Sequence, residues 1–444
     1  MTSDTGSQQA PAYSPRYQRY AVLVLMLTYA LSLLDRQVIS VLNEPIKHEL
    51  GLADWQLGTL TGVAFALLYT SLGIPMARWA DRGDRVRIVI GSLAAWSVFT
   101  MLCGLATSFW TLALARMGVG FGEAGGTPAA QSLITATTPP AKRAAALAVY
   151  ALSLPLAAFL GMGFGGVVAE AWGWRAALIA AGAPGLLLAL LGAFTLREPR
   201  RGGSPGGQAE PPALSRREVV AEFQSKPAYW GLAVGTGISG IVFYGQNAFL
   251  ASLLMRTHGP EVAALGARVG VGPQAFTGLA LGLVIGLSSG VGTVLGGRLG
   301  DRWARRHVSG YAKVPAIVLF FATPLFVAVG LAPTVPTLLG VLAVAVMAQG
   351  LVLGPVAAAI QSIVQPRARA MATAIQLILT NLIGAGLGPL GVGILSDVLS
   401  ARYGPVLGLR WAVAASGLAY AFSWLSFFIA YRMIRGADRS AGTA

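Results

Sequence analysis

Two stretches of the chain, ARWADRGDR at residues 77–85 and GRLGDRWARR at residues 297–306, repeat one another. Their matching charged positions lie 220 residues apart and are Asp81 with Asp301, Arg82 with Arg302, and Arg85 with Arg305. A second pair of segments shares the pattern P-x-x-R-A-x-A-x-A at residues 140–148 and 366–374. Two matched pairs in the same order indicate that the chain is built from two similar halves.

The composition around these repeats is that of a membrane protein. Hydrophobic residues make up 55% of the 444 residues, charged residues only 11%, and the mean hydropathy is +0.66. A soluble domain has about 25% charged residues, so a soluble enzyme and a disordered scaffold are both excluded. The net charge of +15 does not indicate nucleic-acid binding, because in a membrane protein the excess Lys and Arg lie in loops and set the topology.

Twelve apolar stretches are long enough to cross a bilayer as helices of about 20 residues. They are long and continuous rather than alternating, which favours helices over a β-barrel. The first stretch is too long for the apolar region of a signal peptide and reads as an anchor that is retained. The predicted spans are 20–42, 56–78, 88–108, 110–136, 144–170, 176–196, 228–255, 275–297, 312–331, 336–361, 369–396 and 410–433.

The distribution of Lys and Arg predicts the orientation. With both termini in the cytoplasm, 24 of the 32 basic residues lie in cytoplasmic tails and loops, six on the other side and two within spans, as the positive-inside rule requires. We therefore expect an all-α, multi-pass membrane protein with two pseudo-symmetric six-helix bundles. Its predicted parts are a cytoplasmic tail (1–19), a first bundle (20–196), a flexible Gly- and Pro-rich linker (197–226), a second bundle (227–435) and a C-terminal tail (436–444).

Four ionisable residues lie inside the predicted spans: Asp35 and Arg36 in the first, Arg116 and Glu123 in the fourth. Each costs about 2.5–3.5 kcal/mol at the centre of a membrane helix, so we expect them to pair. Their depths favour Asp35 with Arg116 and Glu123 with Arg36. All three His residues map to loops, which makes Asp35 and Glu123 the candidate proton carriers in the membrane; a purely structural ion-pair network is the alternative.

The second half has no charge deep in its spans, and Glu123 maps to Gln349 at the repeat spacing of 226 residues. We therefore predict a cavity that is charged on one wall and apolar or weakly polar on the other. Such a cavity suits an amphipathic substrate with its head group near Arg36 and Arg116. The candidate lining residues of the second half are Tyr244, Asn247, Phe249, Met347 and Gln349.

The repeated loops resemble the signature of the major facilitator superfamily, and the likeness covers about residues 20–433. The resemblance implies that Asp81, Arg82, Arg85, Asp301, Arg302 and Arg305 form a cytoplasmic gate that holds the two halves together in one access state. Two further segments, SLLDRQ at residues 32–37 and RMGVGFGEA at residues 116–124, resemble the spinster-like transporters. This second resemblance implies a transporter that moves a lysolipid or sphingoid-type substrate by alternating access, with Asp35 and Glu123 as coupling groups and Arg36 and Arg116 as the head-group site. The compact loops and alanine-rich composition suggest a bacterial member of the family, for which we expect a location in the cell inner membrane.

Alternatives within transport are a proton-coupled carrier of small organic anions and a drug/proton exporter. An enzyme is not expected, because no His-Glu-x-x-His zinc motif, P-loop or span-located His is present. The run GMGFGG at residues 161–166 fits a dinucleotide fingerprint only formally, and its small residues favour close helix packing. With a single cysteine, Cys103, no disulfide within the chain is possible. We expect no metal or cofactor besides the coupling proton, no nucleic-acid partner, and a monomer in contact with lipid and substrate.

Overall fold

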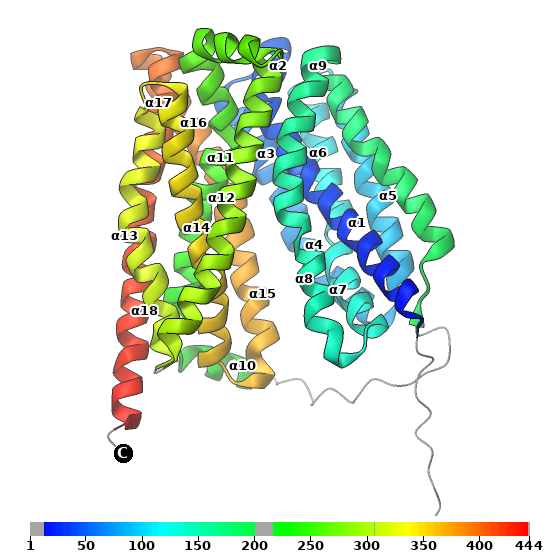
Figure 1. Cartoon of the computed structure of the whole chain (residues 1–444), viewed down its shortest axis with the longest axis vertical. Coiled ribbons are helices and arrows are strands. Elements are labelled where there is room, and N and C mark those ends of the chain that lie inside the picture. Colours follow the sequence, from blue (N-terminus) through cyan, green and yellow to red (C-terminus); the bar gives the residue numbers. More distant parts are fainter. Residues whose placement is uncertain (1–12, 200–215, 306, 443–444) are drawn as a thin grey trace, which may run out of the picture.

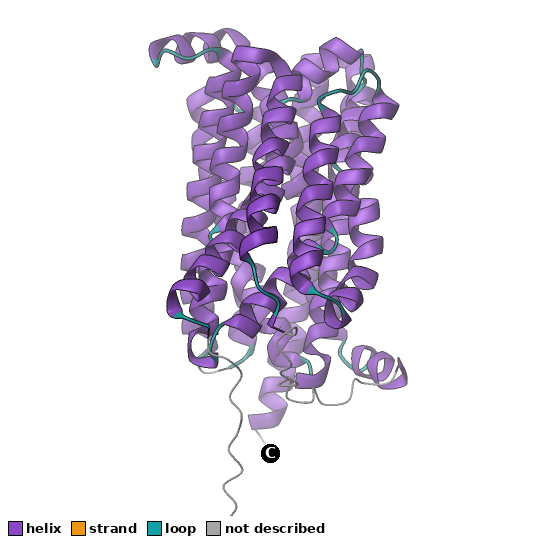
Figure 2. Cartoon of the chain, turned by 90° about the vertical axis from the view of Figure 1, so that its right-hand side faces the viewer, coloured by secondary structure: helices purple, strands orange, loops and turns teal. Residues whose placement is uncertain are grey.

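The computed structural model describes residues 13–199, 216–305 and 307–442. Within these ranges every regular element is a helix (Figure 2). The helices form two lobes side by side (Figure 1), the N-lobe from α1 to α9 and the C-lobe from α11 to α18. We call the side where α1 begins and α10 lies the termini side, and the opposite side the far side.

The N-lobe contains the six predicted spans of the first half. Its helices are α1 (Pro15–Val41), α2 (Asn43–Leu50), α3 (Asp54–Thr61), α4 (Val63–Arg82), α5 (Arg85–Cys103), α6 (Phe109–Glu123), α7 (Gly126–Thr137), η1 (Pro140–Lys142), α8 (Arg143–Ala151) and α9 (Ser153–Thr195). The C-lobe follows α10 (Arg216–Gln224) and consists of α11 (Pro227–Arg268), α12 (Pro273–Ala304), α13 (Ser309–Leu331), α14 (Val335–Ile363), η3 (Pro366–Ala368), α15 (Arg369–Leu379), η4 (Thr380–Leu387), α16 (Gly388–Tyr403), α17 (Pro405–Gly417) and α18 (Ala419–Gly442).

Among the described residues, nine helical stretches are long and apolar enough to cross a membrane. The other crossings are hidden by breaks and mergers. Gly62 divides the second span into α3 and α4, and the step at Ala124–Gly125 divides the fourth into α6 and α7. The fifth and sixth spans are joined in α9, whose chain reverses at Gly173 with φ 82°, a conformation that glycine adopts without steric cost.

The predicted flexible linker is partly wrong. Residues 216–224 form the helix α10, whose Phe223 is buried against the ring of Tyr229. The Glu222 carboxylate accepts a hydrogen bond of 3.0 Å from the backbone N–H of Gln365. One apolar anchor and one cap therefore dock this part of the linker on the C-lobe. The Gly- and Pro-rich part at 200–215 lies outside the described residues.

The predicted N-terminal tail also ends earlier than expected. Helix α1 begins at Pro15, because Pro fits the first helical position and the Ser14 hydroxyl accepts from the backbone N–H of Tyr17.

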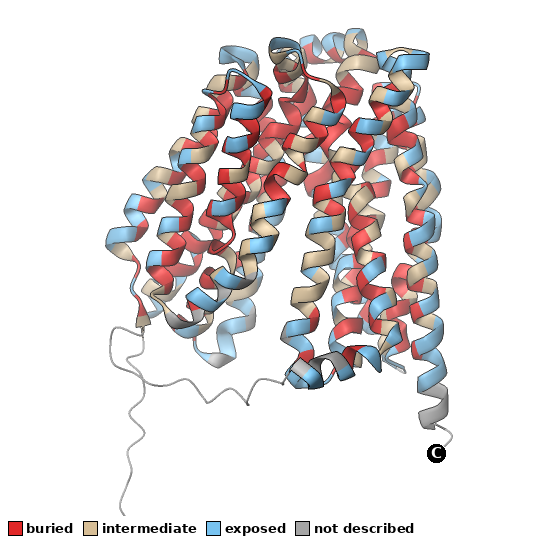
Figure 3. Cartoon of the chain, turned by 180° about the vertical axis from the view of Figure 1, so that it is seen from behind, coloured by how far each residue is buried: buried red, intermediate tan, exposed pale blue. Residues whose placement is uncertain are grey.

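The lobes meet where α9 packs on α12, where α3 and α4 pack on α16 and η4, and where α11 contacts α1 and α2. They diverge towards the termini side (Figure 1). Glycines permit this approach: a Cβ on Gly278 would lie 2.2 Å from the carbonyl oxygen of Met162, and one on Gly58 would lie 2.3 Å from that of Pro389. Within each lobe the buried residues face inwards, and many outer positions are exposed (Figure 3).

Candidate functional site

The four intramembrane charges come from two neighbouring segments of the N-lobe, α1 and α6. Arg116 donates from Nη1 to Oδ2 of Asp35 over 2.8 Å, and its Nε donates to the carbonyl oxygen of Leu60 over 3.3 Å. Arg116 and Asp35 are buried. This is the pair that the sequence predicts.

The second predicted pair is also present. The guanidinium of Arg36 binds Glu123, with Nε 3.1 Å from Oε2 and Nη2 in contact with the same oxygen. The hydroxyl of Ser32, one turn before Arg36 on α1, donates to Oε2 over 2.7 Å. The side chain of Arg36 is 22% exposed whereas that of Glu123 is 1% exposed, so Arg36 is the more accessible residue of this pair.

Two aromatic rings of α4 lie beneath the guanidinium groups. The Cζ atom of Arg36 lies 4.1 Å from the ring centre of Phe65 and 4.7 Å from that of Tyr69. Arg116 also approaches Phe65, at 5.6 Å. Because a cation over an aromatic face is stabilised by the ring quadrupole, these rings add a second stabilising contact to Arg36 and Arg116 besides the carboxylates.

Each carboxylate uses only one of its two oxygens. Oδ1 of Asp35 and Oε1 of Glu123 are buried and have no hydrogen-bond partner among the described residues. A protonated carboxyl needs an oxygen that is not already accepting strong hydrogen bonds. The geometry therefore leaves one oxygen of each pair able to take a proton while the other keeps its contact with the guanidinium.

The C-lobe residues predicted to line the cavity lie in different surroundings. Tyr244 is half-buried and within electrostatic range of Arg36 and Tyr69. Asn247 is half-buried and donates to Oε1 of Gln37 on α1 over 3.1 Å. These two residues of α11 are the part of the predicted C-lobe wall that faces the charged site.

Of the other three predicted lining residues, two are buried. Phe249 is fully buried in the apolar core, Met347 is half-buried, and Gln349 is buried with Oε1 accepting from the hydroxyl of Tyr420 over 2.8 Å. In this conformation Phe249 and Gln349 contribute to packing within the C-lobe.

The repeated loop motifs lie on the termini side and make contacts within their own lobes. Arg85 is buried, and its backbone N–H and guanidinium both bind the carboxylate of Glu198, at the end of the same lobe. Asp301 accepts from the hydroxyl of Tyr311 over 3.1 Å. Arg302 and Arg305 are exposed, and the side chains of Asp81 and Arg82 lie outside the described part of the structure. The gate function of the motif stays a prediction.

A charged cluster that the sequence analysis missed joins the lobes on the far side. Arg256, near the bend of α11, donates to both oxygens of Asp54 over 2.7 and 2.8 Å and to Glu44 over 2.9 Å. Lys47 also binds Asp54, and the hydroxyl of Ser396 on α16 donates to the Asp54 carboxylate over 2.6 Å. Asp54 lies just before the predicted second span. Burial alone would raise the pKa of Asp54, but the hydrogen bonds from Arg256 and Lys47 hold that pKa well below its usual range. We call Glu44, Lys47, Asp54, Arg256 and Ser396 the far-side latch.

Two further carboxylates on the far side cap helices of the opposite lobe. Glu170 of α9 accepts from the backbone N–H of Gln274 over 2.8 Å, at the start of α12. Asp397 of α16 accepts from the backbone N–H groups of Asp54 and Trp55 over 3.0 and 2.7 Å, at the start of α3. Asp54 and Gln274 are 220 residues apart, the spacing of the loop motifs, so the two caps are equivalent contacts of the internal repeat. That equivalence is the sequence signal that could have found them.

Comparisons with known proteins agree with this architecture. Residues 25–389 match the Major Facilitator Superfamily. The chain is 33% identical over 404 residues to an MFS-type efflux pump of Mycolicibacterium smegmatis, covering 89% of this chain and 88% of that protein. It is 29% identical over 255 residues to spinster homolog 3 of Danio rerio, covering 56% and 51%.

A solved structure is similar over almost the whole chain. It is the crystal structure of a bacterial homologue of the human lysosomal transporter Spinster in an inward-facing, unoccupied conformation, with a TM-score of 0.85 and 32% identity, covering 96% of this chain and 99% of that one. The chain belongs to the major facilitator superfamily. It is a spinster-like, multi-pass membrane transporter and not an enzyme, as the two segments in the first and fourth spans predict.

Proposed function

We propose that this transporter moves an amphipathic, lipid-like substrate of the lysolipid or sphingoid type by alternating access, coupled to protons through Asp35 and Glu123. The observation that supports the proposal best is the double ion pair of α1 and α6, in which each carboxylate has one unpartnered oxygen. The similarity to spinster proteins supports the substrate class.

The coupling follows from the electrostatics of the Arg36–Glu123 pair. When Glu123 takes a proton at Oε1, the attraction between its carboxyl and the guanidinium falls, and the partly exposed Arg36 is available to an anionic head group. When the head group leaves, Arg36 returns to Glu123 and favours release of the proton, because a neighbouring cation stabilises the carboxylate. Arg116 is fully buried with Asp35 and positions α6 against α1. The Arg116–Asp35 ion pair is the second pair that takes up and releases a proton in the same transport cycle.

The test is substrate-dependent proton flux in liposomes with Asp35→Asn and Glu123→Gln, using a lysophospholipid and a sphingoid phosphate as probes. Both variants should lose the flux while remaining folded, and Glu49→Gln, which removes an exposed carboxylate of the same lobe, should keep it. If both variants still move protons with substrate, the coupling role of the two carboxylates is wrong. Substrate movement without proton flux in the wild type would contradict proton coupling and leave the substrate class intact.

The second candidate is export of a drug-like or organic-anion substrate, which the similarity to an MFS-type efflux pump favours. A binding screen of lysolipids against sugar acids and cationic drugs separates the two. Preferential binding of sugar acids or drugs would contradict the lipid proposal, because a lipid substrate should bind best through contact of its tail with the apolar C-lobe wall.

We also propose that the protein works as a monomer in the inner membrane with both termini in the cytoplasm, so that the termini side faces the cytoplasm. The excess of Lys and Arg on that side supports this orientation. A fluorescent protein fused to the C-terminus should fluoresce and an alkaline phosphatase fusion should be inactive; the reverse result would overturn the orientation. Light scattering in detergent tests the monomer.

A further inference from the structure

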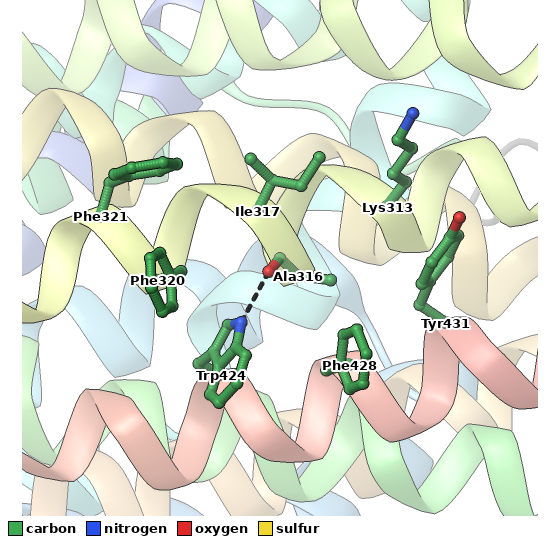
Figure 4. A pocket seen from close by; sticks show the side chains of 8 residues that line it. All are labelled: Lys313, Ala316, Ile317, Phe320, Phe321, Trp424, Phe428 and Tyr431. Carbon is green, nitrogen blue, oxygen red and sulfur yellow. Dashed lines mark hydrogen bonds between the residues drawn. The ribbon is translucent and has the colours of Figure 1, made fainter.

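The outer surface of the C-lobe has a groove that takes no part in the site described above. It lies between α13 and α18 (Figure 4), and its walls are mostly aromatic: Phe320, Phe321, Trp424, Phe428 and Tyr431. Phe320 and Phe321 are 55% and 64% exposed, so large rings line a surface that faces the surrounding membrane.

The aromatic walls are fixed by contacts between the two helices. The indole N–H of Trp424 donates to the carbonyl oxygen of Ala316 over 2.8 Å. Its ring lies 5.5 Å from that of Phe320 and is stacked on Phe428 at 5.7 Å. Trp424, Phe320 and Phe428 are therefore held by the fold itself and lose little side-chain freedom when a flexible chain packs against them.

One end of the groove is positively charged. Lys313 lies among the lining residues, near the start of α13 on the termini side. Arg432 and Arg435 of α18 are exposed. The Cζ atom of Arg432 lies 6.0 Å from the ring centre of Phe428, and that of Arg435 lies 5.9 Å from the ring centre of Tyr431. None of the lining residues is acidic.

Charge and depth together define the ligand. Phe321 lies eight residues beyond Lys313, which is about 12 Å along the helix, close to the ~15 Å of hydrocarbon in one leaflet. A lipid in this leaflet would therefore place its head group at the cations and one acyl chain along the rings. Basic pockets between membrane helices are known to favour anionic head groups over neutral ones.

We propose that this groove is a binding site for an anionic diacyl phospholipid of the leaflet on the termini side, with the phosphate at Lys313, Arg432 and Arg435 and an acyl chain against Phe320, Phe321 and Trp424. The site is on the lipid-facing surface of the C-lobe, whereas the transport site is between the lobes. It depends on the membrane-spanning fold alone and not on the proposed substrate.

The experiment is native mass spectrometry of the purified full-length protein with an equimolar mixture of phosphatidylglycerol and phosphatidylcholine of identical chains. The wild type should retain phosphatidylglycerol preferentially. The variant Lys313→Gln/Arg432→Gln/Arg435→Gln should lose this preference, by up to about fivefold for each cation removed. The matched control Arg268→Gln/Arg402→Gln, which removes exposed cations on the far side, should keep it.

The acyl-chain contact has its own test. Phe320→Ala/Phe321→Ala should weaken retention of both lipids, whereas Phe194→Ala, at an 83% exposed ring of the N-lobe, should not. Equal retention of the two lipids by the wild type, or an unchanged preference in the triple variant, would overturn the proposal. Displacement of the phosphatidylglycerol by an equimolar lysophospholipid would also overturn it, because the groove would then hold substrate.

Discussion

The two lobes have the same helical plan but differ at their centres. In the N-lobe, Glu123 forms an ion pair with Arg36. At the corresponding position of the C-lobe, Gln349 accepts a neutral hydrogen bond from Tyr420. Near the far side the lobes are alike again, since Glu170 and Asp397 cap equivalent helices of the opposite lobe. The repeat thus keeps the contacts that dock the lobes and confines intramembrane charge to one of them.

The largest expected effect comes from breaking the charged centre of the N-lobe. Arg116→Leu leaves Asp35 buried without its cation and should lower the free energy of unfolding by about 3–5 kcal/mol, measured by thermal and denaturant unfolding in detergent. Asp35→Asn/Arg116→Leu should recover most of the loss, because no unpaired charge then remains. A double variant as unstable as the single one would show that the charge of the pair is not the reason.

Breaking the far-side latch should act on conformation rather than on folding. Arg256→Gln removes the cation shared by Asp54 and Glu44. It should shift the equilibrium between the conformations with the lobes joined and separated on the far side by roughly 2–5 kcal/mol, in favour of the separated one. Spin labels at Trp172 and Arg268, both exposed on that side, would report a longer distance between the lobes. Arg175→Gln, which breaks the pair with Glu49 inside the N-lobe, should leave the distance unchanged.

The pH dependence of opening can come from Asp54 in the latch or from the proposed coupling groups, and the two act in different pH ranges. Since the pKa of Asp54 is lowered in the closed state, its contribution is complete above the usual carboxylate value of about 3.9 and is lost only as the pH falls through the lowered pKa. We therefore expect the far-side label distance to be constant between pH 5 and 8 in the variant Asp35→Asn/Glu123→Gln/His48→Gln, which lacks both proposed coupling groups and the imidazole that lies 3.6 Å from Glu44. A change within that range would mean that a group other than these three drives the opening.

A smaller effect is expected at the neutral centre of the C-lobe. Tyr420→Phe removes the donor to Gln349 and leaves a buried oxygen unsatisfied, which should cost about 1–3 kcal/mol of unfolding free energy. Tyr420→Phe/Gln349→Leu should be nearly neutral, because both polar partners are gone. A cost for Tyr420→Phe equal to that of Arg116→Leu would remove the energetic contrast between the lobes.

The smallest effects should come from the two caps, and they should be equal. Glu170→Gln and Asp397→Asn each keep the size of the side chain and remove a charge at a helix N-terminus, for about 0.3–1 kcal/mol. Unfolding midpoints measured side by side would test the equivalence. A clear loss in one variant and none in the other would show that the caps are not matched contacts of the repeat.

The sequence predicts the membrane spans and the central pairs for the same physical reason. A charge inside a membrane has few possible partners, so the depths of Asp35, Arg36, Arg116 and Glu123 in two helices are enough to predict both ion pairs that the structure shows. Breaks such as Gly62 were not predicted, because a single glycine in an apolar span does not by itself show that the helix stops there.

Contacts outside the membrane could not be predicted in this way. Arg256 lies one residue past the predicted seventh span, yet α11 continues to Arg268 and turns the side chain towards Asp54. Arg85 likewise binds Glu198, which the sequence places in the linker. Outside the membrane spans many charged residues are possible partners, and the choice depends on how helices and lobes dock, which the sequence pattern does not encode locally.

The π-helical turn η4 sets the register of the helix that follows it. It holds residues 380–387 in wider turns than an α-helix, which accommodates an extra residue without changing the register of the helix that follows. If the same residues wound as a regular α-helix, Ser396 and Asp397 would rotate away from Asp54 by about the 100° that one residue contributes. The extra residue in the π-helical turn of the eleventh span therefore sets the rotation of α16 on which its contacts with α3 across the lobe interface depend.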